Sequence, residues 1–72
     1  MSKLPRDLPA RKVIAALERF GFHIRRVSGS HSVMVKGSLR TVVPYHAAIK
    51  TGTLKSLLNQ IDMSVEEFIE LL

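Results

Sequence analysis

The sequence predicts an α+β domain in which a helix precedes a three-stranded antiparallel sheet, followed by a second helix and a short final helix. Three observations indicate this order. Apolar residues near the start recur at every third or fourth position, the spacing of a helix with one buried face. Three segments of alternating pattern follow, separated by glycine-containing turns, and the last third returns to helical spacing. We expect both main helices on one face of the sheet, with the other face open to solvent.

The first helix is expected to begin at Leu8-Pro9, since proline suits the first helical turn and Asp7 could cap it or complement its dipole. Its buried stripe is predicted to comprise Ala10, Val13, Ile14, Leu17 and Phe20. Gly21 should end the helix in a left-handed conformation, and Phe22 should fold back onto its last turn.

The strands are predicted from period-two alternation and from the turns between them. They comprise residues 22–27, 31–36 and 39–43. Turns at Gly29 and Gly37 connect them, and Pro44 stops the last strand. Because neighbours in a strand point to opposite faces, Arg25 and Arg26 are expected on opposite sides of the sheet.

Residues 45–50 are expected to form a loop, and the second helix to start around Thr51. Its predicted apolar stripe is Leu54, Leu57, Leu58 and Ile61. Ser64 to Glu67 has the form of a capping box, which opens the short final helix. The residues of that helix expected to face inward are Val65, Phe68, Ile69 and Leu72.

Length and composition limit what the 72 residues can do. We divide them into an N-terminal arm, residues 1–7, and one domain, residues 8–72, with a thin core and no room for an enclosed cofactor. The absence of cysteine excludes disulfides, thiolate nucleophiles and cysteine zinc sites, and fits a reducing compartment. No apolar run approaches the roughly 18 residues of a transmembrane helix. The sequence therefore predicts a cytoplasmic protein without membrane contact.

Charge is unevenly distributed along the chain. Residues 1–46 contain nine Lys and Arg against two Asp and Glu, whereas residues 47–72 contain two against four, which together give the net charge of +5. A basic first part favours a face that binds a polyanion, with nucleic acid as the first candidate. The alternative is that these charges only solvate a surface.

Few side chains could carry chemistry. The strand region lacks a carboxylate pair, the chain lacks a Walker-type glycine loop, and its three histidines lie on separate elements, so we expect no metal site. RNA cleavage remains feasible, because the substrate carries its own nucleophile, the 2′-hydroxyl. An imidazole can move the proton and cations can stabilise the charged phosphate. His31 follows a glycine turn in the most basic region; its alternative role is purely structural.

An ordered set of short motifs resembles a known family. Gly29-Ser30-His31 follows the basic pair Arg25-Arg26. The later segments are Val43-Pro44-Tyr45-His46, residues 49–54, and residues 57–64 running into Glu66-Glu67-Phe68. This pattern is similar to the HicA toxin family (also called YcfA-like), mRNA interferases of HicA–HicB toxin–antitoxin systems, over residues 8–72.

The resemblance implies a fold like that of a double-stranded RNA-binding domain, with an α-β-β-β-α core. It also implies an endoribonuclease that cuts mRNA and blocks translation, with His31 as the catalytic residue, placed by Gly29 and Ser30. A HicB-type antitoxin would hold it inactive by covering the active site, and no cofactor is implied. Phe22 stands where members often have tryptophan, and Ser32 begins a segment without their second histidine or aromatic residue.

The remaining assignments come from the residues themselves. We expect Arg25, Arg26, Lys36 and Arg40 to contact RNA, since they lie on the strands around His31. His46 is either a second acid or base or a loop-stabilising residue, and Tyr45 could stack on a base. The first-helix cations Arg11, Lys12 and Arg19 could extend the RNA surface or meet an acidic partner. The competing functions are a non-catalytic RNA-binding module and a subunit that only binds an acidic protein.

Overall fold

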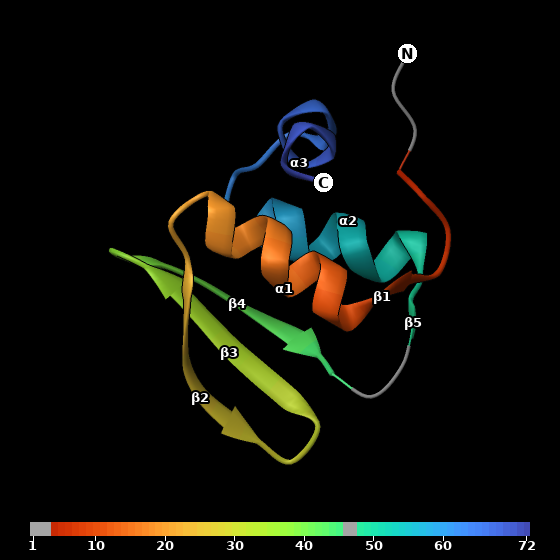
Figure 1. Ribbon diagram of the computed structural model, residues 1–72. Coiled ribbons are helices and arrows are strands. Elements are labelled where there is room, and N and C mark those ends of the chain that lie inside the picture. Colours follow the sequence, from red (N-terminus) through yellow and green to blue (C-terminus); the bar gives the residue numbers. More distant parts are fainter. Residues whose placement is uncertain (1–3, 46–47) are drawn as a thin grey trace.

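The computed structural model describes residues 4–45 and 48–72. Its elements are β1 (Leu8–Pro9), α1 (Ala10–Arg19), β2 (His23–Ser28), β3 (His31–Lys36), β4 (Leu39–Pro44), β5 (Ala48–Ile49), α2 (Thr51–Gln60) and α3 (Val65–Leu71). Strands β2, β3 and β4 form an antiparallel sheet in that order. Helices α1 and α2 lie on one face of the sheet, and α3 lies beyond them (Figure 1). The predicted α+β arrangement, with two main helices on one face and a short final helix, is confirmed.

The start of α1 differs from the prediction. The helix begins at Ala10, its N-cap Pro9 has extended backbone, and no side chain caps it, so the expected cap by Asp7 is wrong. Leu8 and Pro9 instead form β1, which pairs antiparallel with β5 inside the segment expected to be a loop. The reason is local: the residue before a proline is disfavoured in helical conformation, and the proline ring suits an edge strand as well as a helix start.

The end of α1 agrees with the prediction. Gly21 has a φ of 110°, its N–H donates to the Glu18 carbonyl, and the Phe22 N–H donates to the Leu17 carbonyl at 3.0 Å. These two bonds satisfy carbonyls that the helix leaves free at its end. Phe22 folds back as expected and is buried in the core.

Strand β2 departs from simple alternation at Arg25. Ile24 pairs with Met34 and Arg26 pairs with Val33, so Arg25 is an extra residue without a partner in β3, a β-bulge. A bulge shifts every later residue of its strand by one position relative to the alternation. The expectation that Arg25 and Arg26 point to opposite faces assumes an uninterrupted strand. Because the bulge interrupts β2 at Arg25, strict alternation no longer applies to this pair.

The core lies between the sheet and the helices. Met34 and Val43 contribute from the sheet, and Leu17, Leu58 and Phe68 contribute from the three helices; all are nearly or fully buried. Burial of these side chains is the main stabilising term for so small a domain. Part of the predicted N-terminal arm joins them, since Leu4 is also buried in this cluster.

Hydrogen bonds fix β4 and α3. The buried Thr41 hydroxyl donates to Gln60 Oε1 at 2.9 Å, which ties β4 to the end of α2. The predicted capping box is present, because the Glu67 N–H donates to Ser64 Oγ and the Ser64 N–H donates to Glu67 Oε1. Leu72, however, is 43% exposed, so the expectation that it faces inward is wrong: it follows the last residue of α3 and lies beyond the packed turns.

None of the helices in residues 4–45 and 48–72 combines the length and the hydrophobicity that crossing a lipid bilayer requires.

Candidate nucleic-acid interface

The turn between β2 and β3 places His31 at the end of the central strand. Ser28 pairs with His31, so Gly29 and Ser30 form a two-residue hairpin loop. Gly29 has a φ of 59°, a left-handed conformation that glycine adopts without a steric penalty. The His31 side chain is exposed. His31 pairs with Ser28 of β2 along one edge of β3 and with Pro44 of β4 along the other edge. The imidazole is therefore accessible to a ligand and carried by a strand paired on both edges.

The end of β4 lies beside this turn. The Tyr45 N–H donates to the Ser30 carbonyl, which extends the β3–β4 ladder by one bond beyond Pro44. The Tyr45 side chain is 55% exposed. The structure thus brings Tyr45 next to Ser30 and His31, as an aromatic contact for a bound base would need. His46, the other secondary candidate, lies outside the described residues.

His31 belongs to the face of the sheet that the helices leave open. Residues directly opposite each other in neighbouring strands share a face. From the strand pairing, this open face comprises His23, Arg26, Ser28, His31, Val33, Val35, Arg40, Val42 and Pro44. Met34, the alternate residue of β3, is fully buried in the core on the helix side. The open face is therefore available for a large ligand such as a nucleic acid strand.

Three arginines surround a hollow on this open face, which we call the sheet groove. The sheet groove has a volume of about 280 Å³ and is lined by Arg25, Arg26, Val33, Val35 and Arg40. The bulge explains why both Arg25 and Arg26 border it. Val33 at its floor is only 5% exposed although it lies on the face away from the helices, since long arginine side chains can bury their aliphatic stems along apolar surface. The three arginines that line the sheet groove each carry a guanidinium group, which can bind phosphate oxygens through paired hydrogen bonds.

The sheet groove and His31 are aligned along β3. His31 and Val33 are two residues apart on the same face, which corresponds to about 7 Å along a strand. The sheet groove continues from Val33 to Val35 and Arg40, away from His31. A polyanionic chain laid along β3 would contact arginines at one end and meet the imidazole at the other.

Lys36, the fourth cation expected to contact RNA, lies elsewhere. It shares the helix side of the sheet with Met34, and its Nζ lies 4.0 Å from the centre of the Phe20 ring, a cation–π contact. The structure thus brings Arg25, Arg26 and Arg40 together and separates Lys36 from them. Ser28, directly opposite His31, is a polar neighbour that the motif-based prediction missed, although a two-residue loop at Gly29–Ser30 implies that pairing.

Metal-binding side chains do not gather in the part of the chain that the structure describes: no group of three or more His, Asp or Glu residues is close enough to hold an ion.

Comparison with known proteins adds one finding. The family model described as the HicA toxin of bacterial toxin–antitoxin systems matches residues 10–63. The match covers three quarters of the chain, from the first residue of α1 through α2, and it includes His31 and the sheet groove. A comparison with curated proteins gives no match.

Proposed function

The chain belongs to the HicA toxin family and is thus the toxin of a bacterial toxin–antitoxin system, and from this premise we propose that it is a metal-independent endoribonuclease. Its substrate is mRNA, cleavage of which inhibits translation, and a HicB-type antitoxin neutralises it. The observation that supports this proposal is the alignment of an exposed histidine, His31, with three arginines on one open face of the sheet.

Each group has a role in the proposed reaction. The 2′-oxygen of the RNA attacks the adjacent phosphorus, a 2′-O–P bond forms, and the P–O5′ bond breaks. His31 accepts the proton of the 2′-hydroxyl or donates one to the departing 5′-oxygen. Arg25, Arg26 and Arg40 bind phosphates along the strand and counter the charge that develops on the reacting group. The products are a 2′,3′-cyclic phosphate and a 5′-hydroxyl end.

The remaining site residues position the RNA. Gly29 and Ser30 form the tight loop that holds His31 at the strand end. We propose that Tyr45 stacks on a base next to the cleaved bond, which its exposed ring beside Ser30 supports. His46 follows it in the chain and is proposed as a second proton donor or acceptor. A partner that covers His31 would block the reaction directly, which is how we propose that the antitoxin acts.

The test compares three purified proteins on a long unstructured RNA with excess EDTA: wild type, His31→Ala and His23→Ala. His23 is the matched control, because it is also an exposed histidine on the open face of the same sheet. We expect wild type and His23→Ala to cut and to leave 2′,3′-cyclic phosphates. His31→Ala should fold and bind RNA but not cut it.

Two results would contradict the proposal. Cleavage by His31→Ala at the wild-type rate would remove the catalytic role of His31. Binding without cleavage by all three proteins would indicate the non-catalytic RNA-binding module instead. RNA affinity with a steep salt dependence is expected in either case, because it reports phosphate contacts and not chemistry.

A further inference from the structure

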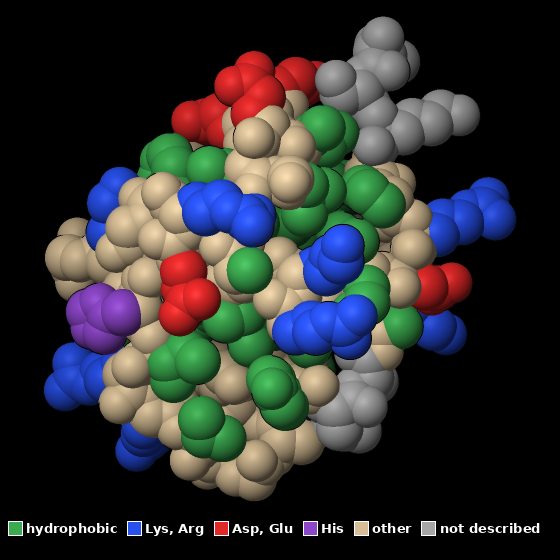
Figure 2. All heavy atoms as spheres, in the orientation of Figure 1, with side chains coloured by type: hydrophobic (Ala, Val, Ile, Leu, Met, Phe, Trp, Pro, Cys, Tyr) green, Lys and Arg blue, Asp and Glu red, His purple; other side chains and the backbone are tan. Residues whose placement is uncertain are grey.

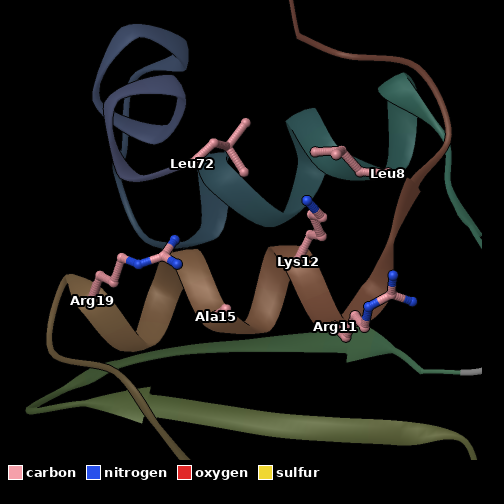
Figure 3. A pocket seen from close by; sticks show the side chains of 6 residues that line it. All are labelled: Leu8, Arg11, Lys12, Ala15, Arg19 and Leu72. Atoms are coloured by element: carbon pink, nitrogen blue, oxygen red, sulfur yellow. The ribbon is translucent and has the colours of Figure 1, made fainter.

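A second groove lies on the helical side of the molecule, and the proposed reaction does not use it. This groove, here called the α1 groove, has a volume of about 470 Å³ (Figure 3). Its lining residues are Leu8, Arg11, Lys12, Ala15, Arg19 and Leu72. They come from β1, from α1 and from the residue that follows α3. The α1 groove therefore combines three cations with an aliphatic floor.

The cations have a regular spacing. Arg11, Ala15 and Arg19 are four residues apart in sequence and so lie along one stripe of α1. Arg11 and Arg19 are separated by about 12 Å along the helix axis, with the small Ala15 between them. Arg19 is held in place, since its Nη1 donates to the Leu71 carbonyl at 2.6 Å. Leu8 and Leu72 supply the apolar contacts beside this stripe, and Leu72 is 43% exposed.

The α1 groove is separate from the site proposed for RNA. Helix α1 packs on the face of the sheet opposite the one that carries His31 and the sheet groove. Figure 2 shows Lys and Arg side chains gathered over α1, and Asp and Glu side chains gathered over α3 next to it. The acidic residues of α3 are Glu66, Glu67 and Glu70. The positive surface at α1 is therefore bounded by a negative one.

We propose that the α1 groove binds an acidic, partly aliphatic segment of the partner antitoxin, apart from the contacts that block His31. The proposal rests on the proposed function, because the partner is the antitoxin of this toxin. Carboxylates about 12 Å apart would meet Arg11 and Arg19, and aliphatic side chains between them would cover Ala15, Leu8 and Leu72. An extended segment with acidic residues four positions apart has this spacing.

The lining favours a protein segment over RNA. Among the described residues that line the α1 groove, none is an aromatic on which a base could stack, and the floor is aliphatic. An RNA strand continuing past Leu72 would approach the carboxylates of α3, which repel phosphates. A short acidic peptide ends before it reaches them. Such an anchor would let the antitoxin stay attached to the toxin while it releases the sheet face.

The test measures binding of a synthetic peptide with the repeat Glu-Ser-Leu-Ser-Glu (the Glu–Leu peptide), and of its counterpart with Gln in place of Glu (the Gln–Leu peptide), by fluorescence anisotropy and by NMR. In an extended peptide, residues two positions apart share a face, so its Glu and Leu side chains can enter the groove together. The variant is Arg11→Glu with Lys12→Glu, two exposed residues of α1. The matched control is Arg25→Glu with Arg26→Glu in β2, which changes the net charge by the same amount. We expect the Glu–Leu peptide to shift resonances of Leu8, Ala15 and Leu72, and the α1 variant to bind it about tenfold more weakly or worse than the β2 variant.

The outcomes separate this inference from the proposed function. The α1 variant should cut RNA at the wild-type rate; loss of cleavage together with peptide binding would make α1 part of the RNA surface and overturn the inference. Equal affinity for the Gln–Leu peptide, or equal peptide affinity of both variants, would overturn it as well. The inference would also be overturned if an RNA oligonucleotide shifted the same resonances of Leu8, Ala15 and Leu72. If the wild type cuts no RNA, the proposed function fails, and the peptide titration still decides what the α1 groove binds.

Discussion

Arg26 lies directly opposite Val33 across β2 and β3, although Ile24, two residues earlier, already pairs with Met34, the next residue of β3. Two residues of β2 therefore advance the register by only one residue of β3, and Arg25 is the extra residue. This bulge brings two adjacent arginines to the rim of one hollow, where an uninterrupted strand would have separated them. The phosphate-binding capacity of the open face thus depends on one irregularity in the strand pairing.

The first prediction concerns these arginines. Replacing Arg25 and Arg26 together by alanine should weaken RNA binding at low salt and reduce the salt dependence of that binding. For single-stranded RNA, removing one phosphate-binding cation should make the slope of log K against log salt shallower by about 0.7. RNA affinity measured by filter binding at several salt concentrations gives the slope. The control is Lys55→Ala, an exposed cation of α2 away from the sheet, which should leave the slope unchanged.

A double variant with an unchanged slope would contradict the placement of RNA on the sheet groove. A weaker affinity of this variant can be ascribed to the missing cations and not to unfolding. All residues of β2 are exposed, and the two alanines uncover Val33 but none of the core cluster on the helix side. A thermal melt of the same sample checks that the variant is folded at the temperature of the binding measurement.

The second prediction concerns Lys36, whose ammonium lies over the Phe20 ring. Lys36→Met keeps most of the aliphatic stem but removes the charge, so the protein should lose about 1 kcal/mol of stability from the cation–π interaction. In a domain of this size, that corresponds to a melting temperature lower by about 4–8 °C. RNA affinity should fall less than in Arg40→Ala, which removes a cation of the sheet groove. The opposite order would restore Lys36 as an RNA contact.

Much of the fold was predictable from local patterns, and the exceptions are a pairing between distant segments and an irregularity within one strand. Gly21 with Phe22 and the Ser64 capping box carry their own hydrogen bonds, so a short stretch of sequence suffices to predict them. The pairing of β1 with β5 joins segments about 40 residues apart, and no local periodicity encodes it. The bulge at Arg25 does have a local signal, which the expected alternation overlooked. The apolar residues Ile24 and Val27 are three positions apart, so polar and apolar residues stop alternating at the two arginines between them.

The site was predictable in part. The glycine turn and the alternation place His31 at a strand end, as the structure shows. The same alternation puts Lys36 on the side of Met34, so its separation from the arginines follows from the pattern once Met34 is assigned to the core. The α1 groove needed the structure, since Leu8 and Leu72 reach it from opposite ends of the chain.

The third prediction concerns the capping box of α3. Ser64→Ala removes the acceptor for the Glu67 N–H and should cost about 1 kcal/mol of folding stability. Ser56→Ala in the exposed part of α2 is the control; alanine has the higher helix propensity there, so stability should stay equal or rise slightly. Urea denaturation of both variants measures the difference. Equal midpoints would show that the capping box does not stabilise the folded protein.

The last prediction uses two hairpin glycines in equivalent positions. Gly29 and Gly37 each stand first in a two-residue loop, and each has a φ of 59°. Apart from the adjacent residues of the chain, no heavy atom lies within 4 Å of where a Cβ would be at either position. An added methyl group therefore meets open space, and the cost of alanine is only that of the left-handed backbone, about 1–2 kcal/mol at either site. The two variants should show similar losses of stability.

The two variants should differ in RNA cleavage, because only Gly29 belongs to the loop that leads directly into His31. Relief of the strain in Gly29→Ala would reshape the Gly29–Ser30 loop and move the end of β3 that carries His31, whereas the same relaxation at Gly37 occurs at the far end of that strand. Cleavage rates measured well below both melting temperatures, where each variant is folded, should therefore be reduced in Gly29→Ala and near wild type in Gly37→Ala. Equal rates in the two variants would mean that the loop does not control the position of His31, and the reaction would then have to depend on the sheet face as a whole.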